Sequence, residues 1–246
     1  MANILSIDFD FFPIAEEYTI LEHYPDPIDL PTNCSTQVWA IHYAHWEGNE
    51  KLLEIAVDWE KIDEIKDIIY DSQKAIGYIT NSHKHLYDAI KDRYDTEEKI
   101  HIYNLDMHHD LFNDNEKVDC GNWAKYVLEE YPKATLTWIA NPLSKKMYGL
   151  EEPEFNIIEE DLNCLHGLEW DLIYLCRSDN WTPPHLDDAF LKLSGAMLDC
   201  CFPCLGEREV LEPRYNDSFI KRVEEIQKEN ETTIGKQYRV INKIKD

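Results

Sequence analysis

The stretch Asn104-Leu105-Asp106-Met107-His108-His109-Asp110 continues an apolar run that begins at Ile100. The run is short, apolar and β-prone, so it predicts a buried strand that ends in polar side chains. Successive side chains of an extended chain alternate between two faces, so we expect Asp106, His108 and Asp110 to project to the same side. Two carboxylates and an imidazole at a strand end are a candidate set of metal ligands. A polar turn after the strand is the alternative.

A second strand of this kind opens the chain. Residues Ile4 to Phe12 are apolar and β-prone, but they include Asp8 and Asp10, again two residues apart and therefore expected on one face. Asp is unfavourable in strands, and broken local preferences tend to mark functional sites. We therefore predict that both aspartates bind a metal, with a surface strand end as the alternative.

Strand-like and helix-like stretches alternate along the rest of the chain. Strands are predicted at Ile76–Ile79, Ala134–Ile139, Trp170–Cys176 and Gln237–Ile241. Helices are predicted at Trp59–Gln73, His83–Arg93, Asp187–Leu198 and Ser218–Lys228, and another is predicted to follow Trp123 and continue through Leu128. Residues 13–50 are punctuated by prolines and are predicted to be a loop. The pattern predicts an α/β fold of three layers, with a mostly parallel sheet between helices, as a single domain over residues 1–246.

Two histidines follow the strand predicted at Ile76–Ile79. Ser82 is a candidate helix cap, so His83 and His85 would lie in the first turn of a helix. Open parallel sheets bind ligands at the carboxyl ends of their strands, so either histidine is a candidate ligand, with a plain surface position as the alternative. The predicted ligand set is Asp8, Asp10, one of these histidines, Asp106, His108 and Asp110.

Oxygen-rich sites without cysteine favour manganese, with iron or cobalt as alternatives. Two such ions can activate a water for hydrolysis. The chain has 24 Lys and Arg against 49 Asp and Glu, a net charge of −25. This charge argues against nucleic acid as a partner, and it suits a cationic substrate or solubility alone.

No apolar run reaches the roughly 18 residues that a membrane span needs. The residues Met1-Ala2-Asn3 lack the basic character of a secretion signal, so we expect a cytoplasmic protein. Seven cysteines without an export signal predict free thiols, and this includes the pair in Cys201-Phe202-Pro203-Cys204. The sequence leaves an oligomer open.

These motifs resemble those of the arginase/deacetylase (ureohydrolase) superfamily. Asp106-Met107-His108-His109-Asp110 is similar to its Asp-x-His-x-Asp motif, and Ser6-Ile7-Asp8-Phe9-Asp10-Phe11-Phe12 to its Ser-x-Asp-x-Asp strand. The Asp-x-Asp-Phe-Phe form resembles a divergent branch that includes the peptide arginases of ribosomal peptide maturation. Those enzymes convert arginine side chains to ornithine and release urea. Asn81-Ser82-His83 resembles that branch's single-histidine motif, which favours His83 over His85.

The resemblance implies an arginase-like fold, two Mn²⁺ ions, and an arginine-containing peptide or a small guanidino compound as substrate. It also implies roles for single residues. Asp110 would orient the attacking hydroxide and accept its proton. Asn122 and Trp123, in and after a segment similar to the Ser-Gly-Asn of arginases, would contact substrate, as would Arg177 and Ser178.

Two departures from the arginase pattern leave alternatives open. The Asp-x-Asp strand comes first here but later in ordinary arginases, so either the strand order is permuted or Asp8 and Asp10 are not ligands; Asp179 is then a rival ligand. Trp123 stands where arginases carry a histidine, which leaves His109 or His85 as candidates for proton transfer. Alternative functions are a deacetylase-like amidohydrolase and a binding protein with an inactive arginase-like site.

Overall fold

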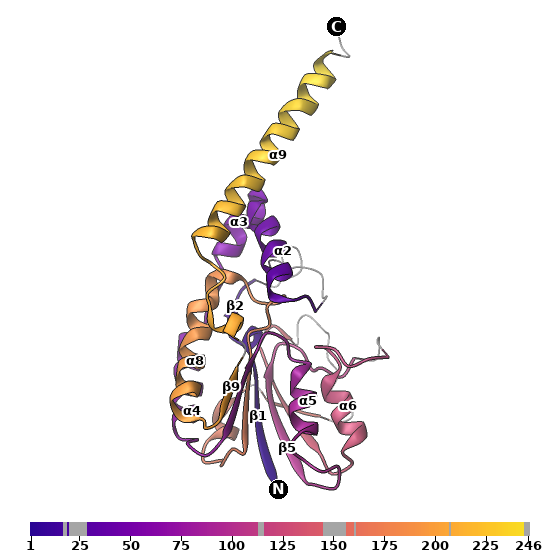
Figure 1. Cartoon of the computed structure of the whole chain (residues 1–246), viewed down its shortest axis with the longest axis vertical. Coiled ribbons are helices and arrows are strands. Elements are labelled where there is room, and N and C mark those ends of the chain that lie inside the picture. Colours follow the sequence, from indigo (N-terminus) through magenta and orange to yellow (C-terminus); the bar gives the residue numbers. More distant parts are fainter. Residues whose placement is uncertain are drawn as a thin grey trace.

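The protein is built on a seven-stranded sheet in the order β7-β6-β5-β1-β8-β4-β9 (Figure 1). This computed structural model describes residues 1–16, 19, 29–112, 116–144, 156–159, 161–206 and 208–243, with the backbone alone at 46–49, 156–159 and 232–243. All neighbouring strands of the sheet run parallel. The strands are β1 (Ala2–Asp8), β4 (Ile76–Thr80), β5 (Ile100–Asp106), β6 (Thr135–Ala140), β7 (Asn156–Glu159), β8 (Leu172–Cys176) and β9 (Cys204–Gly206).

Helices cover both faces of this sheet, which confirms the predicted three-layer α/β architecture. Helices α4 and α8 pack together on one face and α5 and α6 on the other (Figure 1). The α-helices are α2 (Thr32–Ala44), α3 (Trp46–Leu53), α4 (Trp59–Tyr70), α5 (His85–Lys91), α6 (Trp123–Glu130), α8 (Asp187–Cys200) and α9 (Asp217–Lys243). The 3-10 helices are η1 (Phe9–Phe11), η2 (Leu162–Leu165), η3 (Pro184–Leu186) and η4 (Arg208–Leu211). A small antiparallel pair joins β2 (Pro13–Ile14) to β3 (Ala56–Val57).

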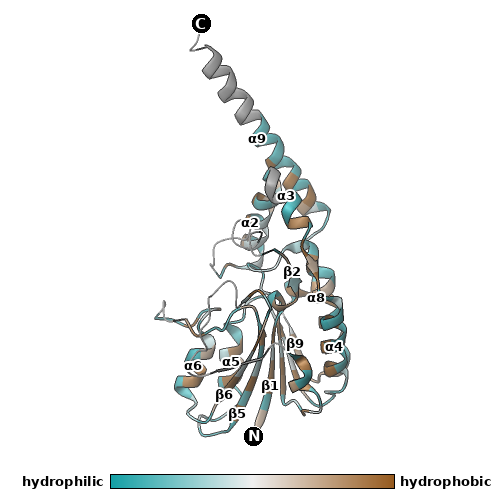
Figure 2. Cartoon of the chain, turned by 180° about the vertical axis from the view of Figure 1, so that it is seen from behind, coloured by the Kyte–Doolittle hydropathy of each residue, from teal (hydrophilic) through white to brown (hydrophobic). Residues whose placement is uncertain are grey.

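The core consists of two apolar clusters, one on each face of the sheet. Leu5 and Ile7 of β1 belong to the cluster under α4 and α8, whereas Ile4 belongs to the cluster under α5 and α6. This is the period-two alternation of a strand buried on both faces. Figure 2 shows the resulting concentration of apolar residues on the strands and on the helix sides turned toward them. The same alternation places Ser6 and Asp8 on the α5–α6 face.

Two sequence predictions of secondary structure are wrong. Residues 32–44 and 46–50, which lie in the predicted loop, belong to α2 and to α3, and α3 continues to Leu53. Pro31 directly precedes α2 rather than interrupting it, and the buried side of α2 includes Ser35, whose hydroxyl donates to the carbonyl of Asp179. The apolar pattern that predicts a helix is therefore weak in this segment. The predicted strand Gln237–Ile241 is part of α9, whose helical backbone continues to Lys243.

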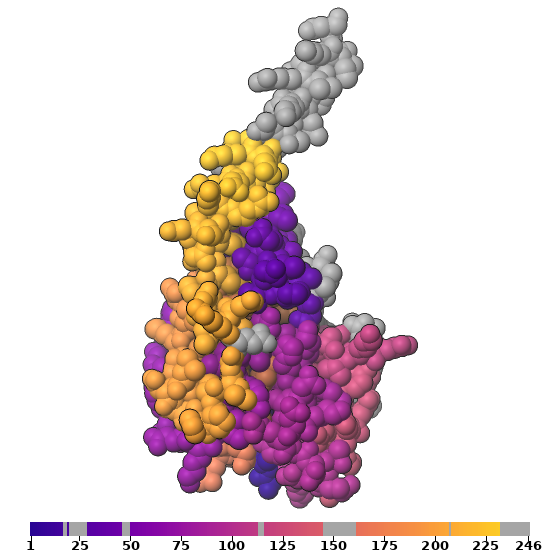
Figure 3. Space-filling model, in the orientation of Figure 1, coloured from indigo at the N-terminus to yellow at the C-terminus, as the bar shows by residue number. Residues whose placement is uncertain are grey.

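Helix α9 extends away from the sheet (Figure 1). Its first turns lie beside α2, and the space-filling view shows these turns against the segment that contains α2 (Figure 3). Phe219 and Ile226 are buried in that contact. The single-domain assignment over residues 1–246 remains a prediction.

Candidate metal centre

Strand pairing brings the two sequence motifs together. Strand β1 lies between β5 and β8, and Ile7 pairs with Leu105. The next residues, Asp8 and Asp106, therefore lie side by side at the carboxyl ends of these adjacent strands. Both project to the α5–α6 face by alternation, and they are 3% and 0% exposed. The early position of the Asp-x-Asp strand in the chain therefore does not separate it from the Asp-x-His-x-Asp motif.

Strand alternation does not place the other predicted ligands. Strand β1 ends at Asp8, and Asp10 lies in the 3-10 turn η1; β5 ends at Asp106, before His108 and Asp110. Hydrogen bonds from backbone N–H groups to the aspartate carboxylates shape these turns. Asp106 Oδ1 accepts from the backbone N–H of His108 at 2.7 Å, and Asp10 Oδ1 accepts from that of Met107 at 3.1 Å. The structure brings the residues that the sequence singled out close together, but those after the strand ends reach this place through turns.

His83 is surrounded by three carboxylates. Its Nδ1 lies 3.1 Å from Asp8 Oδ2, 3.1 Å from Asp106 Oδ2 and 3.0 Å from Asp110 Oδ2. None of these contacts has hydrogen-bond geometry. Ligands about 2.1 Å from an octahedral ion lie about 3.0 Å from one another at right angles. The distance from His83 Nδ1 to each of these three oxygens therefore matches that between neighbouring ligands of a divalent cation.

A second ligand group adjoins the first. His108 Nδ1 lies 3.0 Å from Asp10 Oδ2 and 3.5 Å from Asp106 Oδ1. Asp10 Oδ2 is buried and has no hydrogen-bond partner among the residues described. The ligand atoms of each group, Asp8–His83–Asp106 and Asp10–Asp106–His108, all lie within 4.8 Å of one another. Because Asp106 belongs to both groups, they form one centre that can hold metal ions.

Buried neighbours fix the orientation of these ligands. Ser6 Oγ lies 2.6 Å from His83 Nε2, so with Nε2 as the donor the Nδ1 lone pair is left for a metal. Asn104 Nδ2 donates to Asp106 Oδ2 at 3.1 Å. The indole N–H of Trp123 donates to Asp110 Oδ2, and its ring centroid lies 4.7 Å from that of His83.

The charge in this centre calls for a cation. Four carboxylates and two imidazoles are each at most 7% exposed, and burying uncompensated charge is costly. Burial and the charge of Asp106 raise the pKa of Asp110 to about 8. Burial opposes protonation of His83, but its carboxylate neighbours raise its pKa well above the usual value. Protons thus offset part of the charge, and a divalent ion can replace them.

His83 and not His85 joins the centre. His85 lies on α5 and lines a separate surface hollow with Tyr78 and Asp88. The predicted cap is wrong, since Ser82 Oγ donates to Asp29 Oδ2 at 2.9 Å, and Lys84 precedes the helix. His83 therefore reaches the ligands from the turn between β4 and α5.

Asp179, the rival ligand, is occupied elsewhere. Its carboxylate is in a buried ion pair with Arg177, and Arg214 Nη1 donates to its carbonyl at 2.7 Å. Arg177 is itself fully buried and also donates to the carbonyl oxygens of Val210 and Glu212. The predicted substrate contact through Arg177 does not fit this burial, because its guanidinium supports the loop after β8.

The other predicted substrate or catalytic residues differ in their positions. Ser178 follows β8 with a left-handed backbone, φ +56°, beside the centre's edge of the sheet. Asn122 is buried and holds its own loop, donating to the carbonyl of Lys117 at 3.0 Å. His109 Nδ1 accepts from the N–H of Leu111, and the His109 ring packs on Phe112, outside both ligand groups.

Sequence reasoning missed Trp181 and Arg214. The ring of Trp181 lies 4.6 Å from that of His108, centroid to centroid. Arg214 donates to Asp187 and to the carbonyls of Asp179 and Thr182, which joins the loop after β8 to the start of α8. Trp181 could have been noticed as a tryptophan in the polar segment after Cys176. No local signal in the sequence points to Arg214.

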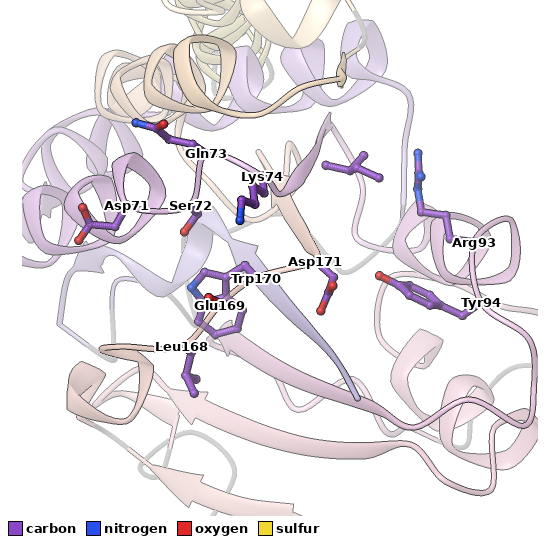
Figure 4. A pocket seen from close by; sticks show the side chains of 11 residues that line it. Asp71, Ser72, Gln73, Lys74, Arg93, Tyr94, Leu168, Glu169, Trp170 and Asp171 are labelled. Atoms are coloured by element: carbon purple, nitrogen blue, oxygen red, sulfur yellow. The ribbon is translucent and has the colours of Figure 1, made fainter.

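A polar cavity of about 620 Å³ lies at the opposite edge of the sheet (Figure 4). It opens where β4 and β8 begin, and Figure 4 shows Trp170, Asp171 and Tyr94 around it. Burial and the charge of Asp171 raise the pKa of Tyr94 to about 12. This cavity includes none of the candidate ligands and is separate from the candidate metal centre.

No known protein family, curated protein or solved structure gives a significant match to this chain. Within the described residues, no helix combines the length and apolarity needed to cross a membrane. All seven cysteines are free, which confirms the prediction of thiols.

Proposed function

We propose that this protein is a metal-dependent hydrolase of the ureohydrolase type. It would hold two manganese ions and hydrolyse the guanidinium group of an arginine side chain in a peptide to ornithine and urea. The observation that carries the proposal is the pair of buried ligand groups that share Asp106. Asp106 lies near His83 through Oδ2 and near His108 through Oδ1, so it would help to hold both ions.

The donor set supports manganese over zinc. The ligand atoms are carboxylate oxygens and imidazole nitrogens, without a thiolate, and the spacing around His83 fits octahedral coordination. Asp8, His83, Asp106 and Asp110 would hold one ion, and Asp10, Asp106 and His108 the other. The net charge of −25 would speed the encounter with a cationic substrate.

Bound ions would supply a water of lowered pKa beside the substrate carbon. Asp110 is the group that we expect to orient this water and take its proton. In the metal-free centre, burial and Asp106 raise the pKa of this carboxyl to about 8, and bound cations would lower it. Trp123 fixes this carboxylate by donating its indole N–H to Oδ2.

Urea release tests the proposal. We expect the manganese-loaded protein to convert an arginine-containing peptide to the ornithine peptide with one equivalent of urea. His83→Ala should abolish this activity, and the matched His85→Ala variant should keep it, because His85 lies outside the centre. A metal-loaded protein that releases no urea, or that instead releases acetate from an acetyl-lysine peptide, would contradict the proposal.

A further inference from the structure

The metal centre is most exposed on the side of His108. That residue is 7% exposed, whereas each of the other five ligands is 3% exposed or less. The ring of Trp181 lies against His108 at 4.6 Å and 54°. Trp181 is partly exposed, whereas the other side chains described above as contacting the ligands are fully buried. Trp181 is therefore the partly exposed side chain next to the most exposed of the candidate ligands.

The loop that carries Trp181 is held firmly. The N–H of Trp181 donates to the carbonyl of Ser178 at 2.8 Å, next to the left-handed backbone of that serine. Thr182 Oγ1 donates to the carbonyl of Arg177 at 2.7 Å, and Arg214 Nη2 donates to that of Thr182 at 2.9 Å. A non-glycine residue is kept in this backbone conformation only where its surroundings impose it, often at functional sites.

We propose that Trp181 is a specificity-determining residue whose indole face receives a planar, delocalised cation beside His108. The inference rests on the proposed function, and it names what the site selects: a charged guanidinium over a neutral group of the same shape. Guanidinium is planar and weakly hydrated, so it stacks on aromatic faces, and tryptophan gives the strongest cation–π contact. The net charge of −25 favours a cation in the same way.

Binding of two isosteric probes to the manganese-loaded protein tests this role. The probes are N-acetylarginine amide, which is cationic, and N-acetylcitrulline amide, which is neutral. We expect Trp181→Leu to raise the Kd of the arginine probe by about 3- to 30-fold and to leave that of the citrulline probe unchanged. Trp59→Leu is the matched control, because Trp59 is an exposed tryptophan on α4. Trp181→Phe keeps a weaker aromatic face and should give a smaller change in the same direction.

Metal content distinguishes binding from packing. We expect both Trp181 variants to keep the manganese content of the natural protein. Loss of manganese would mean that Trp181 only covers His108, and it would overturn the inference. Equal weakening of the two probes, or no weakening of either, would also overturn it. If Trp181→Leu does not fold, the same criteria apply to Trp181→Phe.

The inference and the proposed reaction can fail separately. Suppose that no arginine peptide releases urea but the Trp181 variants selectively lose affinity for the arginine probe. The proposed hydrolysis is then wrong, and the proposed role of Trp181 in binding the cation is supported. If urea is released and Trp181→Leu leaves KM unchanged, the proposed hydrolysis is supported and the proposed role of Trp181 is wrong.

Discussion

Replacing Asp110 with Asn should stabilise the metal-free protein and weaken its response to metal. Burial and Asp106 raise the pKa of Asp110 from 3.8 to about 8. A carboxyl group whose pKa is higher in the folded state contributes most to stability below pH 3.8, and this contribution is lost as the pH rises toward 8. The metal-free protein should therefore become less stable across this range.

The size of the effect follows from the same shift. Between pH 3.8 and pH 7, Asp110 ionises in the unfolded chain but stays protonated in the folded protein. This difference lowers the free energy of unfolding by about 4 kcal/mol, at 1.36 kcal/mol per pH unit. Asn removes this cost but loses the charge interaction between the Asp110 carboxylate and His83 Nδ1 at 3.0 Å, worth about 0.5–3 kcal/mol for a contact within such a network. We expect a net gain of about 1–3 kcal/mol, or roughly 3–10 °C in Tm.

Thermal unfolding at pH 7, with a chelator and then with manganese, measures both effects. The natural protein should gain stability from manganese, and Asp110→Asn should gain less. Asp88→Asn is the control, because Asp88 is exposed on α5, and it should leave both transitions in place. A lower Tm for metal-free Asp110→Asn, together with an unchanged response to manganese, would refute the reasoning.

Three further predictions concern the support of the centre. Ser6→Ala removes the contact with His83 Nε2 and should weaken manganese affinity by about 10- to 100-fold; an unchanged titration would argue against this role. His83→Ala should bind less manganese by elemental analysis than His85→Ala, and equal contents would contradict the ligand assignment. Arg214→Met removes the guanidinium that pairs with the buried carboxylate of Asp187 at 2.7 Å and should lower the free energy of unfolding by about 3–5 kcal/mol in urea, whereas a loss under about 1 kcal/mol would show that the network is dispensable.

The positions of the central strands were predictable because these strands are buried on both faces, whereas the short edge strands β7 and β9 were not predicted. Strands β5 and β8 are short apolar runs, and the sequence places them to within a few residues. Their parallel order then brings the polar residues after each strand to one edge. This is why Asp8, Asp106 and His83 could be predicted as neighbours before the pairing of β1 with β5 was known.

The remaining features depend on contacts between distant residues. Helix α2 is fixed partly by polar bonds, with both Ser35 and Trp39 donating to the carbonyl of Asp179. Arg214 acts on a loop more than 30 residues away in sequence. No local pattern encodes such contacts. Periodicity alone therefore predicts neither helix α2 nor the hydrogen bonds of Arg214 to this loop.

Anomalous diffraction at the manganese edge from manganese-loaded crystals would test the central claim most directly. We predict two peaks about 3.5–4 Å apart, one among Asp8, His83, Asp106 and Asp110, and one among Asp10, Asp106 and His108. The absence of a peak at this edge of the sheet, or a peak only at another position, would contradict the assignment of a metal centre.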